Sequence, residues 1–102
     1  MKLHGHILTH TTLETKDGWT RMVYHRTCVA EYNPFLRVVR LNSGGWRTVT
    51  TKHRINQFFR TFDIPYSLYQ SKGDWFISNP KHTRLDDKFM ILEFKDNMEF
   101  NY

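Results

Sequence analysis

The 102-residue sequence has very little cysteine, no long apolar run and, over its middle third, no acidic residue at all. The single cysteine, Cys28, excludes an internal disulfide and gives no indication of an oxidising compartment. No apolar segment approaches the about 18 residues of a membrane-spanning helix, and the N-terminal segment MKLHGHILTH lacks the apolar centre of a signal peptide. We therefore expect a soluble cytosolic protein that has no membrane partner.

The composition is typical of a folded globular chain. Hydrophobic residues make up 39% of the sequence and aromatic residues 16%, which excludes a disordered tail. The length predicts one small domain over residues 1–102, with a single core. Because phenylalanine, tyrosine and tryptophan form so much of the apolar set, we expect much of that core to be aromatic.

The net charge of +5 is unevenly distributed along the chain. Residues 32–62 contain six lysines or arginines and no acid, whereas residues 86–102 contain five acids against two lysines. Such asymmetry indicates an anionic partner for the basic centre. Alternatively, the acidic C-terminal strands lie beside the basic centre and neutralise it.

The first half of the chain favours β-strands, since it is rich in β-branched and aromatic residues. We expect strands at residues 20–32, 35–41 and 46–49, separated by turns at Asn33-Pro34 and Gly44-Gly45. The first two of these strands would form a hairpin. Residues 1–19 are a candidate for an added strand or arm.

One amphipathic helix is predicted at about residues 51–62. An apolar stripe at helical spacing supports it, formed by Ile55, Phe58, Phe59 and Phe62. Thr50 or Thr51 is the expected N-cap, and Pro65 should end the helix by disfavouring the α conformation before it. The residues expected to point away from the stripe are His53, Asn56, Gln57 and Arg60.

Two further hairpins are predicted after the helix. The first joins residues 66–70 to residues 75–78 through a four-residue turn, Ser71 to Asp74, that contains Gly73. The second joins a buried strand at residues 89–94 to residues 98–102. The sequence therefore predicts an α+β fold, in which an antiparallel β-sheet of about five to seven strands packs on a single amphipathic helix.

Three segments of the sequence form a recognisable pattern: LNSGGWRTVTTKHRINQFF, YSLYQSKGDWFIS and ILEFKDNMEF. They resemble a family of small uncharacterised tailed-phage proteins, whose pattern is an SGGWxTxTTKxRxNQ block followed by a YQxxGxWFV hairpin. Ile77 stands where that pattern has valine. The resemblance covers roughly residues 20–100 and implies a phage protein expressed in the cytoplasm of a bacterial host. It implies no particular activity.

Catalytic and metal-binding patterns are weak. Cys28 and His25 are three residues apart, so on one strand they would face opposite sides and could not form a nucleophile–base pair. His4, His6 and His10 have no further ligand at a recognised zinc spacing. Neither a phosphate-binding loop nor a nucleophile elbow is present. We expect no enzyme activity, no cofactor and no metal.

The predicted start of the helix suggests an anion-binding site. A helix N-terminus favours anions, yet the predicted first turn contains the basic residues Lys52, His53 and Arg54. A bound phosphate would offset the unfavourable interaction of their positive charge with the helix dipole. The candidate nucleic-acid or anion-binding residues are Arg40, Arg47, Thr50, Thr51, Lys52, Arg54 and Arg60. Alternatively, a carboxylate of the chain itself packs there, from Asp63, Asp74 or Glu93.

Trp46 directly precedes this segment. We expect it to be a core residue that covers the helix, and the alternative is that its ring stacks on a nucleic-acid base.

Two classes of function fit these features. In the first, the protein is a small module that binds nucleic acid through the basic helix N-terminus. In the second, it is an inhibitor of a host defence or transcription enzyme of the anti-CRISPR type, and its partner is a host nucleic-acid-binding protein. The inhibitor would use an acidic C-terminal hairpin for that contact, with Glu93, Asp96 and Glu99 as the candidate residues.

Overall fold

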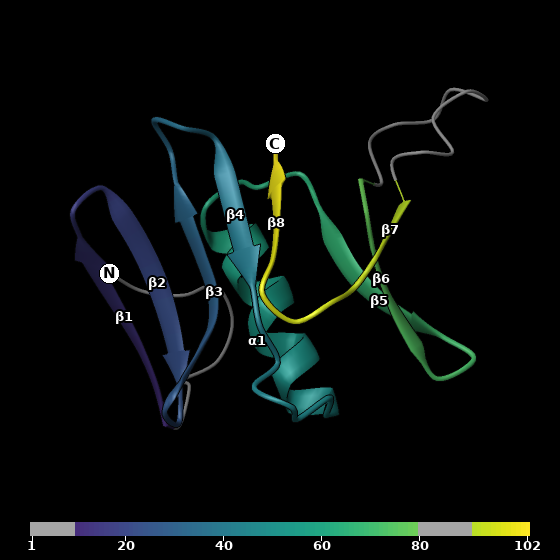
Figure 1. Cartoon of the computed structure of the whole chain (residues 1–102). Coiled ribbons are helices and arrows are strands. Elements are labelled where there is room, and N and C mark those ends of the chain that lie inside the picture. The colour runs from purple at the N-terminus through teal and green to yellow at the C-terminus, as the bar shows by residue number, and fades with distance from the viewer. Residues whose placement is uncertain (1–9, 80–90) are drawn as a thin grey trace.

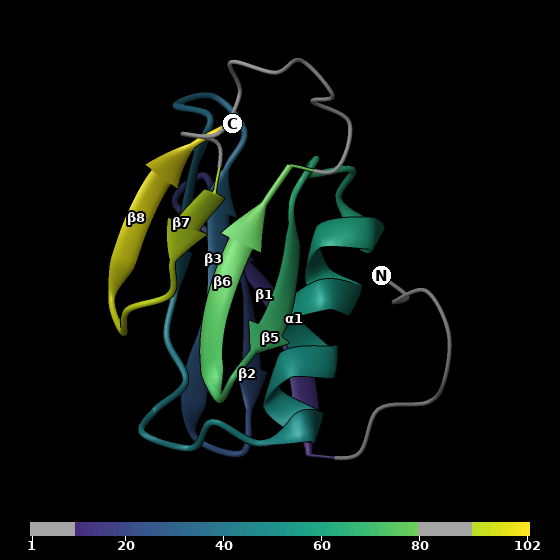
Figure 2. The same ribbon diagram turned by 90° about the vertical axis from the view of Figure 1, so that its right-hand side faces the viewer.

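Antiparallel strands pack on one side of a single helix in the structure (Figure 1 and Figure 2). The computed structural model describes residues 10–79 and 91–102. Its elements are, in chain order, β1 (Thr11–Lys16), β2 (Trp19–Tyr24), β3 (Thr27–Asn33), β4 (Val38–Leu41), α1 (Val49–Thr61), β5 (Ser67–Ser71), β6 (Asp74–Ser78), β7 (Ile91–Glu93) and β8 (Met98–Asn101). The predicted α+β class is confirmed. The first strand lies within the N-terminal segment proposed to add a strand or arm, of which residues 1–9 lie outside the described part.

The strands form two sheets. One sheet has five strands in the order β1-β2-β3-β4-β8, and the other has three in the order β5-β6-β7 (Figure 1). The chain passes between the sheets twice, first through α1 and later through the connection from β7 to β8.

The last two strands therefore do not form the predicted hairpin. Phe94, which follows β7, is buried, and its N–H donates to the carbonyl oxygen of Trp75 at 2.9 Å. The two rings also meet edge to face, with centroids 5.3 Å apart. The contacts of Phe94 with Trp75 thus hold the segment after β7 against the small sheet, whereas β8 pairs with β4 in the large one.

Residues 20–32, predicted to be one strand, form a hairpin instead. Strands β2 and β3 pair across the two-residue turn His25-Arg26, in which His25 has a positive φ of 57°. Glycine and asparagine are the residues that usually mark such turns, and neither occurs here. The next predicted hairpin is confirmed: the Asn33 side chain accepts the N–H groups of Phe35 and Leu36 and so forms the turn that leads into β4.

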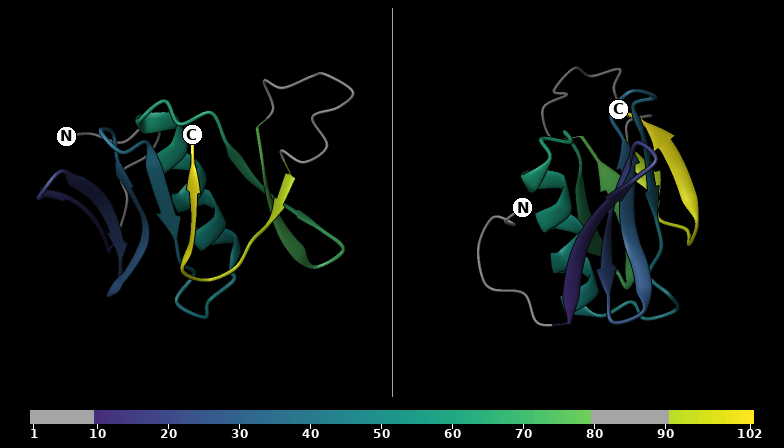
Figure 3. Two further views of the ribbon diagram at one scale, coloured as in Figure 1. Left: turned by 45° about the horizontal axis from the view of Figure 1, so that its top comes forward. Right: turned by 90° about the vertical axis from the view of Figure 1, so that its left-hand side faces the viewer.

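Helix α1 packs its apolar stripe against both sheets, in contact with β2, β3 and β5. Figure 2 shows the helix on one side of the strands, and Figure 3 shows the same arrangement from two further directions. Ile55, Phe58 and Phe59 are buried, as predicted, and Phe62 is half-buried. Burial of a large apolar side chain stabilises a fold by about 1.5–3 kcal/mol, so this stripe is a major part of the core.

The polar face of the helix differs from the prediction at two positions. His53 and Arg60 are exposed as expected, but Gln57 is buried. Asn56 is half-buried, and its side chain bonds the backbone of Leu68 in β5: Oδ1 accepts the N–H at 2.7 Å and Nδ2 donates to the carbonyl oxygen at 2.9 Å. Because β5 packs alongside the helix, part of the helix surface that was predicted to face solvent is covered, and its polar side chains bond within the protein.

The helix begins at Val49, with Thr48 rather than Thr50 or Thr51 as its N-cap. Thr48 has extended backbone angles, and its Oγ1 accepts the N–H of Thr51 at 3.2 Å. The short strand predicted at residues 46–49 is therefore wrong. The β-branched residues Thr48 and Val49 favour a strand by type, but here they form the N-cap and the first position of the helix. At the other end, Asp63 has a positive φ of 55°, and the N–H of Ile64 donates to the carbonyl oxygen of Phe59.

The β5–β6 hairpin is confirmed, but its turn is shorter than predicted. Ser71 and Asp74 already belong to the paired strands, which leaves Lys72 and Gly73 as a two-residue loop. Both have positive φ, 52° and 85°, as a type I′ turn requires. A left-handed conformation at a lysine has no signal in the sequence.

Candidate nucleic-acid interface

Basic side chains leave the N-terminal end of α1 in different directions. Lys52 Nζ donates to Gln70 Oε1 on β5 at 3.2 Å, whereas Arg54 Nε donates to Thr11 Oγ1 on β1 at 3.1 Å. Because successive helix residues are about 100° apart, positions 52 and 54 lie on different sides of the helix. They are the fourth and sixth residues of the helix, so Lys52 closes the first turn whereas Arg54 lies beyond the first turn in which it was predicted.

Arg47 lies on the side of the small sheet. Its guanidinium carbon is 5.2 Å from the ring centroid of Phe94 and 5.8 Å from that of Trp75. Such a cation–π contact keeps the charge at the surface while the side chain covers the aromatic core below it.

Arg40 and Arg60 are not part of this group. Arg40 belongs to a row of charges across the large sheet, where it pairs with Glu31 and Glu99 from the neighbouring strands. Arg21 continues the row by pairing with Glu31. Arg60 is exposed in the last turn of the helix, at the end opposite to the N-terminus. The predicted neutralisation by acidic strands therefore occurs at Arg40.

The bases near the helix N-terminus have no such partner in the described residues. There, no carboxylate oxygen lies within 4.0 Å of a charged nitrogen of Arg47, Lys52 or Arg54. In the described part of the chain, none of the acids suggested as internal partners forms such an ion pair. Asp63 follows the C-terminal end of the helix, whereas Asp74 and Glu93 directly precede Trp75 and Phe94, the two residues whose rings Arg47 covers.

The acidic candidates for a partner contact are not gathered on one hairpin. Glu93 is exposed on the small sheet, and Glu99 accepts a hydrogen bond from Arg40 Nε at 2.6 Å on the large one. Asp96 Oδ1 accepts hydrogen bonds from the backbone N–H and the hydroxyl of Ser43, at 2.8 and 2.7 Å. Two of the three carboxylates thus stabilise the fold itself.

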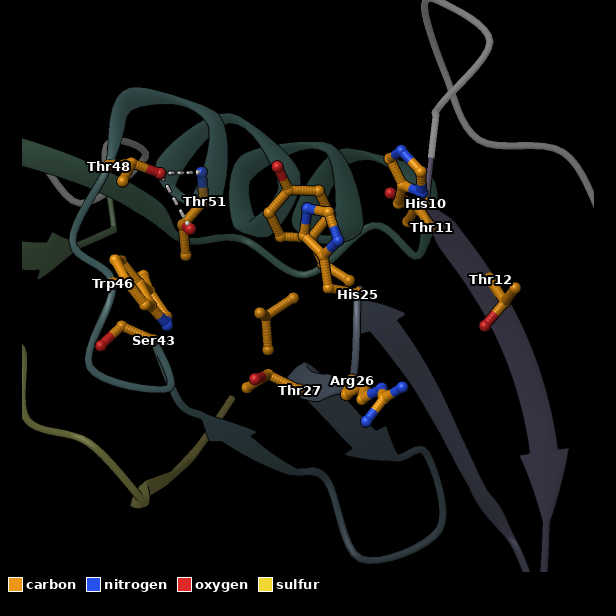
Figure 4. Close-up of a pocket in the computed structure, with 12 residues that line it drawn as sticks. His10, Thr11, Thr12, His25, Arg26, Thr27, Ser43, Trp46, Thr48 and Thr51 are labelled. Carbon is orange, nitrogen blue, oxygen red and sulfur yellow. Dashed lines mark hydrogen bonds between the residues drawn. The ribbon is translucent and has the colours of Figure 1, made fainter.

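A pocket of about 900 Å³ opens beside the N-terminal end of α1 (Figure 4). It lies between the loop that precedes α1, the β2–β3 turn and the start of β1. Its lining residues are His10, Thr11, Thr12, Tyr24, His25, Arg26, Thr27, Val29, Ser43, Trp46, Thr48 and Thr51. Of the predicted site residues, only Thr51 lines the pocket, and Arg54 lies beside it, bonded to Thr11 and with its guanidinium 5.5 Å from the Tyr24 ring.

Trp46 is exposed, which corrects the prediction of a core tryptophan. Its exposed fraction is 71%, whereas Trp75 is buried and Trp19 lies beneath the guanidinium of Arg40. Among the site threonines, Thr51 is buried with its hydroxyl 3.1 Å from that of Thr48, and Thr50 is exposed. Of the three tryptophans, Trp46 is thus the one that is largely exposed, and it lies at the pocket.

The loop that carries Trp46 is held in place at several points. Ser43 is bonded to Asp96, and the Trp46 N–H donates to the Ser43 carbonyl oxygen at 3.1 Å. At Gly44, with φ of 67°, an added Cβ would lie only 2.6 Å from Thr27 Oγ1. Glycine is therefore required there by both conformation and space, and its close approach to Thr27 shapes one wall of the pocket.

Cys28 does not have the environment of a nucleophile. A β-bulge at this point in β3 brings Cys28 and Glu31 to the same side, with Sγ 3.8 Å from Glu31 Oε2. Burial is the main cause that raises the pKa of the Cys28 thiol from 9.0 to about 11; the Glu31 carboxylate contributes to the increase, and Arg21 opposes it. A reactive cysteine needs the opposite shift.

We expect Cys28 in the folded protein to react with iodoacetamide at pH 8 about 100-fold more slowly than in urea, because a pKa higher by about two units lowers the thiolate fraction by that factor. The raised pKa also means that the folded state holds its proton between pH 9 and 11 while the unfolded state loses it, so stability should fall as the pH rises through this range. Equal alkylation rates in the two states would contradict this environment.

No group of three potential ligands that could hold a metal ion occurs in residues 10–79 and 91–102. His10 instead stacks on His25, with ring centroids 4.8 Å apart, while His4 and His6 lie outside the described part. Over the same described ranges, no helix has the length and apolar character needed to cross a membrane.

Sequence reasoning missed most of the pocket. Tyr24, His25 and Thr27 come from a hairpin that was predicted as one strand, and their arrangement depends on the unpredicted turn. The only local signal was the SGGWRT segment, where two glycines precede an aromatic residue and a base.

A model of the Kyanoviridae Gp96 protein family matches residues 4–101 of the chain. No curated protein and no solved structure matches it significantly.

Proposed function

The chain belongs to the Kyanoviridae Gp96 family, a family of tailed-phage proteins, and we propose that it is a small non-enzymatic accessory protein that binds nucleic acid in the host cytoplasm. The observation that supports this proposal best is the positive charge around the N-terminal end of α1. Among the described residues, Arg47, Lys52 and Arg54 form no ion pair, whereas the carboxylates of Glu31 and Glu99 pair with Arg21 and Arg40 across the large sheet.

The divergence of the bases suits a polymer better than a single anion. Arg54 lies on the β1 side of the helix, and Lys52 and Arg47 lie on the side of the small sheet. A nucleic-acid backbone that crosses the N-terminal end of the helix would place successive phosphates near the basic side chains on both sides of it. The N-terminal end of the helix, whose dipole also favours anions, lies between them.

Arg54 has a structural role as well. It bonds Thr11 and Gln57, at 3.1 and 3.3 Å, and so links the helix to β1. Neutralising the three bases should therefore leave stability nearly unchanged or lower it slightly. The helix dipole offers little compensation, since its effect falls off within the first turn.

We expect the Arg47→Gln/Lys52→Gln/Arg54→Gln variant to bind single-stranded and duplex DNA and RNA more weakly at every sequence. Each lost phosphate contact should reduce the slope of log K against log salt by about 0.9 on duplex DNA or about 0.7 on a single strand. Fluorescence anisotropy over a salt series from about 50 mM measures both quantities.

A charge-matched control separates a site from a general effect of net charge. Lys16→Gln/Arg37→Gln/Arg60→Gln removes the same charge from exposed positions at the end of β1, before the start of β4 and in the last turn of α1, away from the N-terminal end of the helix. This control should keep most of the slope. The proposal fails if the parent protein does not bind at low salt, or if the two triple variants lose affinity equally.

The inhibitor class makes a different prediction for host lysate. A tagged protein that captures one host protein after nuclease treatment, and does so through Glu93 rather than the bases, would contradict direct nucleic-acid binding. The structure offers that class little support, because Asp96 and Glu99 are bonded within the chain.

A further inference from the structure

The pocket in Figure 4 has features that the phosphate contacts above do not use. Its volume of about 900 Å³ falls within the range of about 300–1,000 Å³ that is common for small-molecule sites. Its walls combine aromatic rings with several hydroxyl groups, and this combination recognises a flat, polar ring system better than an aliphatic chain.

Trp46 is the main aromatic group that a ligand can reach. Most of its surface is exposed although the loop beneath it is held by the bonds from Ser43 to Asp96. A large aromatic ring that stays exposed contributes little to the stability of the fold. Such a ring can instead stack on a nucleic-acid base, and this stacking contributes binding energy with every base type.

The side of the pocket at the β2–β3 turn is also aromatic. His25 stacks on His10 and lies against Tyr24, with centroid distances of 4.8 and 4.4 Å. The hydroxyl groups of Thr27 and Thr48 line the space between this cluster and Trp46. They can accept or donate hydrogen bonds to the edge of a base.

Positive charge borders the same space. Arg26 is a lining residue, and Arg54 lies beside Thr11 and Tyr24. The start of α1, at Thr48 and Thr51, forms another part of the wall. Arg26 lies across the pocket from Trp46 (Figure 4), so a nucleotide whose base stacks on Trp46 would extend its phosphate across the pocket toward these cations.

We propose that this pocket binds one unpaired nucleotide, with the base stacked on Trp46 and the phosphate directed toward Arg26 and Arg54. This inference rests on the proposed function and makes it specific for single strands, since a base in a duplex has both faces covered by its neighbours. A free nucleotide has the same base and phosphate groups as a nucleotide within a single strand. Binding measurements with adenosine monophosphate and uridine monophosphate test whether the pocket takes a free nucleotide instead.

The test is Trp46→Ala, with Phe35→Ala as the matched control. In the part of the chain that the structure describes, Phe35 is the other phenylalanine, tyrosine or tryptophan that is mostly exposed, at 88%, and it lies in the β3–β4 turn. Trp46→Ala should melt at the parent temperature and bind a single strand about 5- to 150-fold more weakly, which corresponds to about 1–3 kcal/mol for one stacked base. The salt slope and the duplex affinity should stay unchanged.

Trp46→Phe provides a second measurement. It should keep part of the single-strand affinity, because a phenyl ring still stacks, but it should lose the ligand-induced quenching of tryptophan fluorescence that the parent shows. Phe35→Ala should bind like the parent in every assay.

The outcomes separate this inference from the proposed function. Normal single-strand affinity in Trp46→Ala overturns the pocket while leaving phosphate binding intact, and so does an equal loss on duplex and single strand. If the parent binds no polymer but binds the monophosphates through Trp46, the pocket is a free-nucleotide site and the proposed function fails. Binding of neither overturns both.

Discussion

Phe58→Ala is expected to lower the free energy of unfolding by about 3–5 kcal/mol. Phe58 is fully buried and contacts the rings of Tyr32 and Phe62, with centroids 5.6 and 4.8 Å away. The substitution removes a ring at the contact between the helix and the large sheet, where neighbouring side chains cannot fill the space without moving the backbone. A small domain has about 5–15 kcal/mol in total, so this loss removes a large part of it.

The measurement is thermal and urea unfolding followed by circular dichroism. We expect the melting temperature of Phe58→Ala to fall by about 12 °C or more, given about 4–8 °C per kcal/mol for a domain of this size. His53→Ala, on the exposed side of the same helix, should change stability by no more than about 0.5 kcal/mol. The reverse order would contradict the observed helix orientation.

Asn56→Ala is expected to cost about 2–5 kcal/mol, although it removes no apolar contact. Its amide satisfies both the N–H and the carbonyl oxygen of Leu68, a buried residue of β5. These two groups point away from β6, the hydrogen-bonded neighbour of β5, so no strand replaces the lost partner. Each unsatisfied buried group costs about 1–3 kcal/mol.

The Leu68 amide gives a local measurement in addition to the melt. Its hydrogen exchange should become much faster in Asn56→Ala, whereas Asn56→Asp should protect it partly, since a carboxylate can accept the N–H but cannot donate to the carbonyl oxygen. Asn101→Ala is the matched control, because that asparagine is exposed. Equal melting temperatures for the variants at positions 56 and 101 would rule out this role for Asn56.

The charge pattern was a partial guide to the site. It singled out the basic residues of positions 32–62 as one group, but it could not show that Arg40 pairs with Glu31 and Glu99 whereas Lys52 and Arg54 contact neutral side chains. Pairing of charges depends on strand register, and the Arg40 and Glu99 partners are 59 residues apart in the chain. The sequence alone left both outcomes open.

Trp46 shows the same limit for an apolar residue. Its type and its neighbours favoured the core, and its exposure follows from a loop anchored through Ser43 to Asp96, near the other end of the chain. The pocket beside it also depends on the His25-Arg26 turn, whose residues have no turn signature.

The sequence by itself determined the fold class, the buried stripe of Ile55, Phe58 and Phe59, and the β3–β4 and β5–β6 hairpins. These features depend on periodicity and turn residues within about 20 positions, where local preferences act directly. Only the tertiary structure decided the division into two sheets, the separation of β7 from β8 and the walls of the pocket. Those features depend on which distant segments pack together, because burial and hydrogen bonding between strands reward contacts that no local pattern encodes.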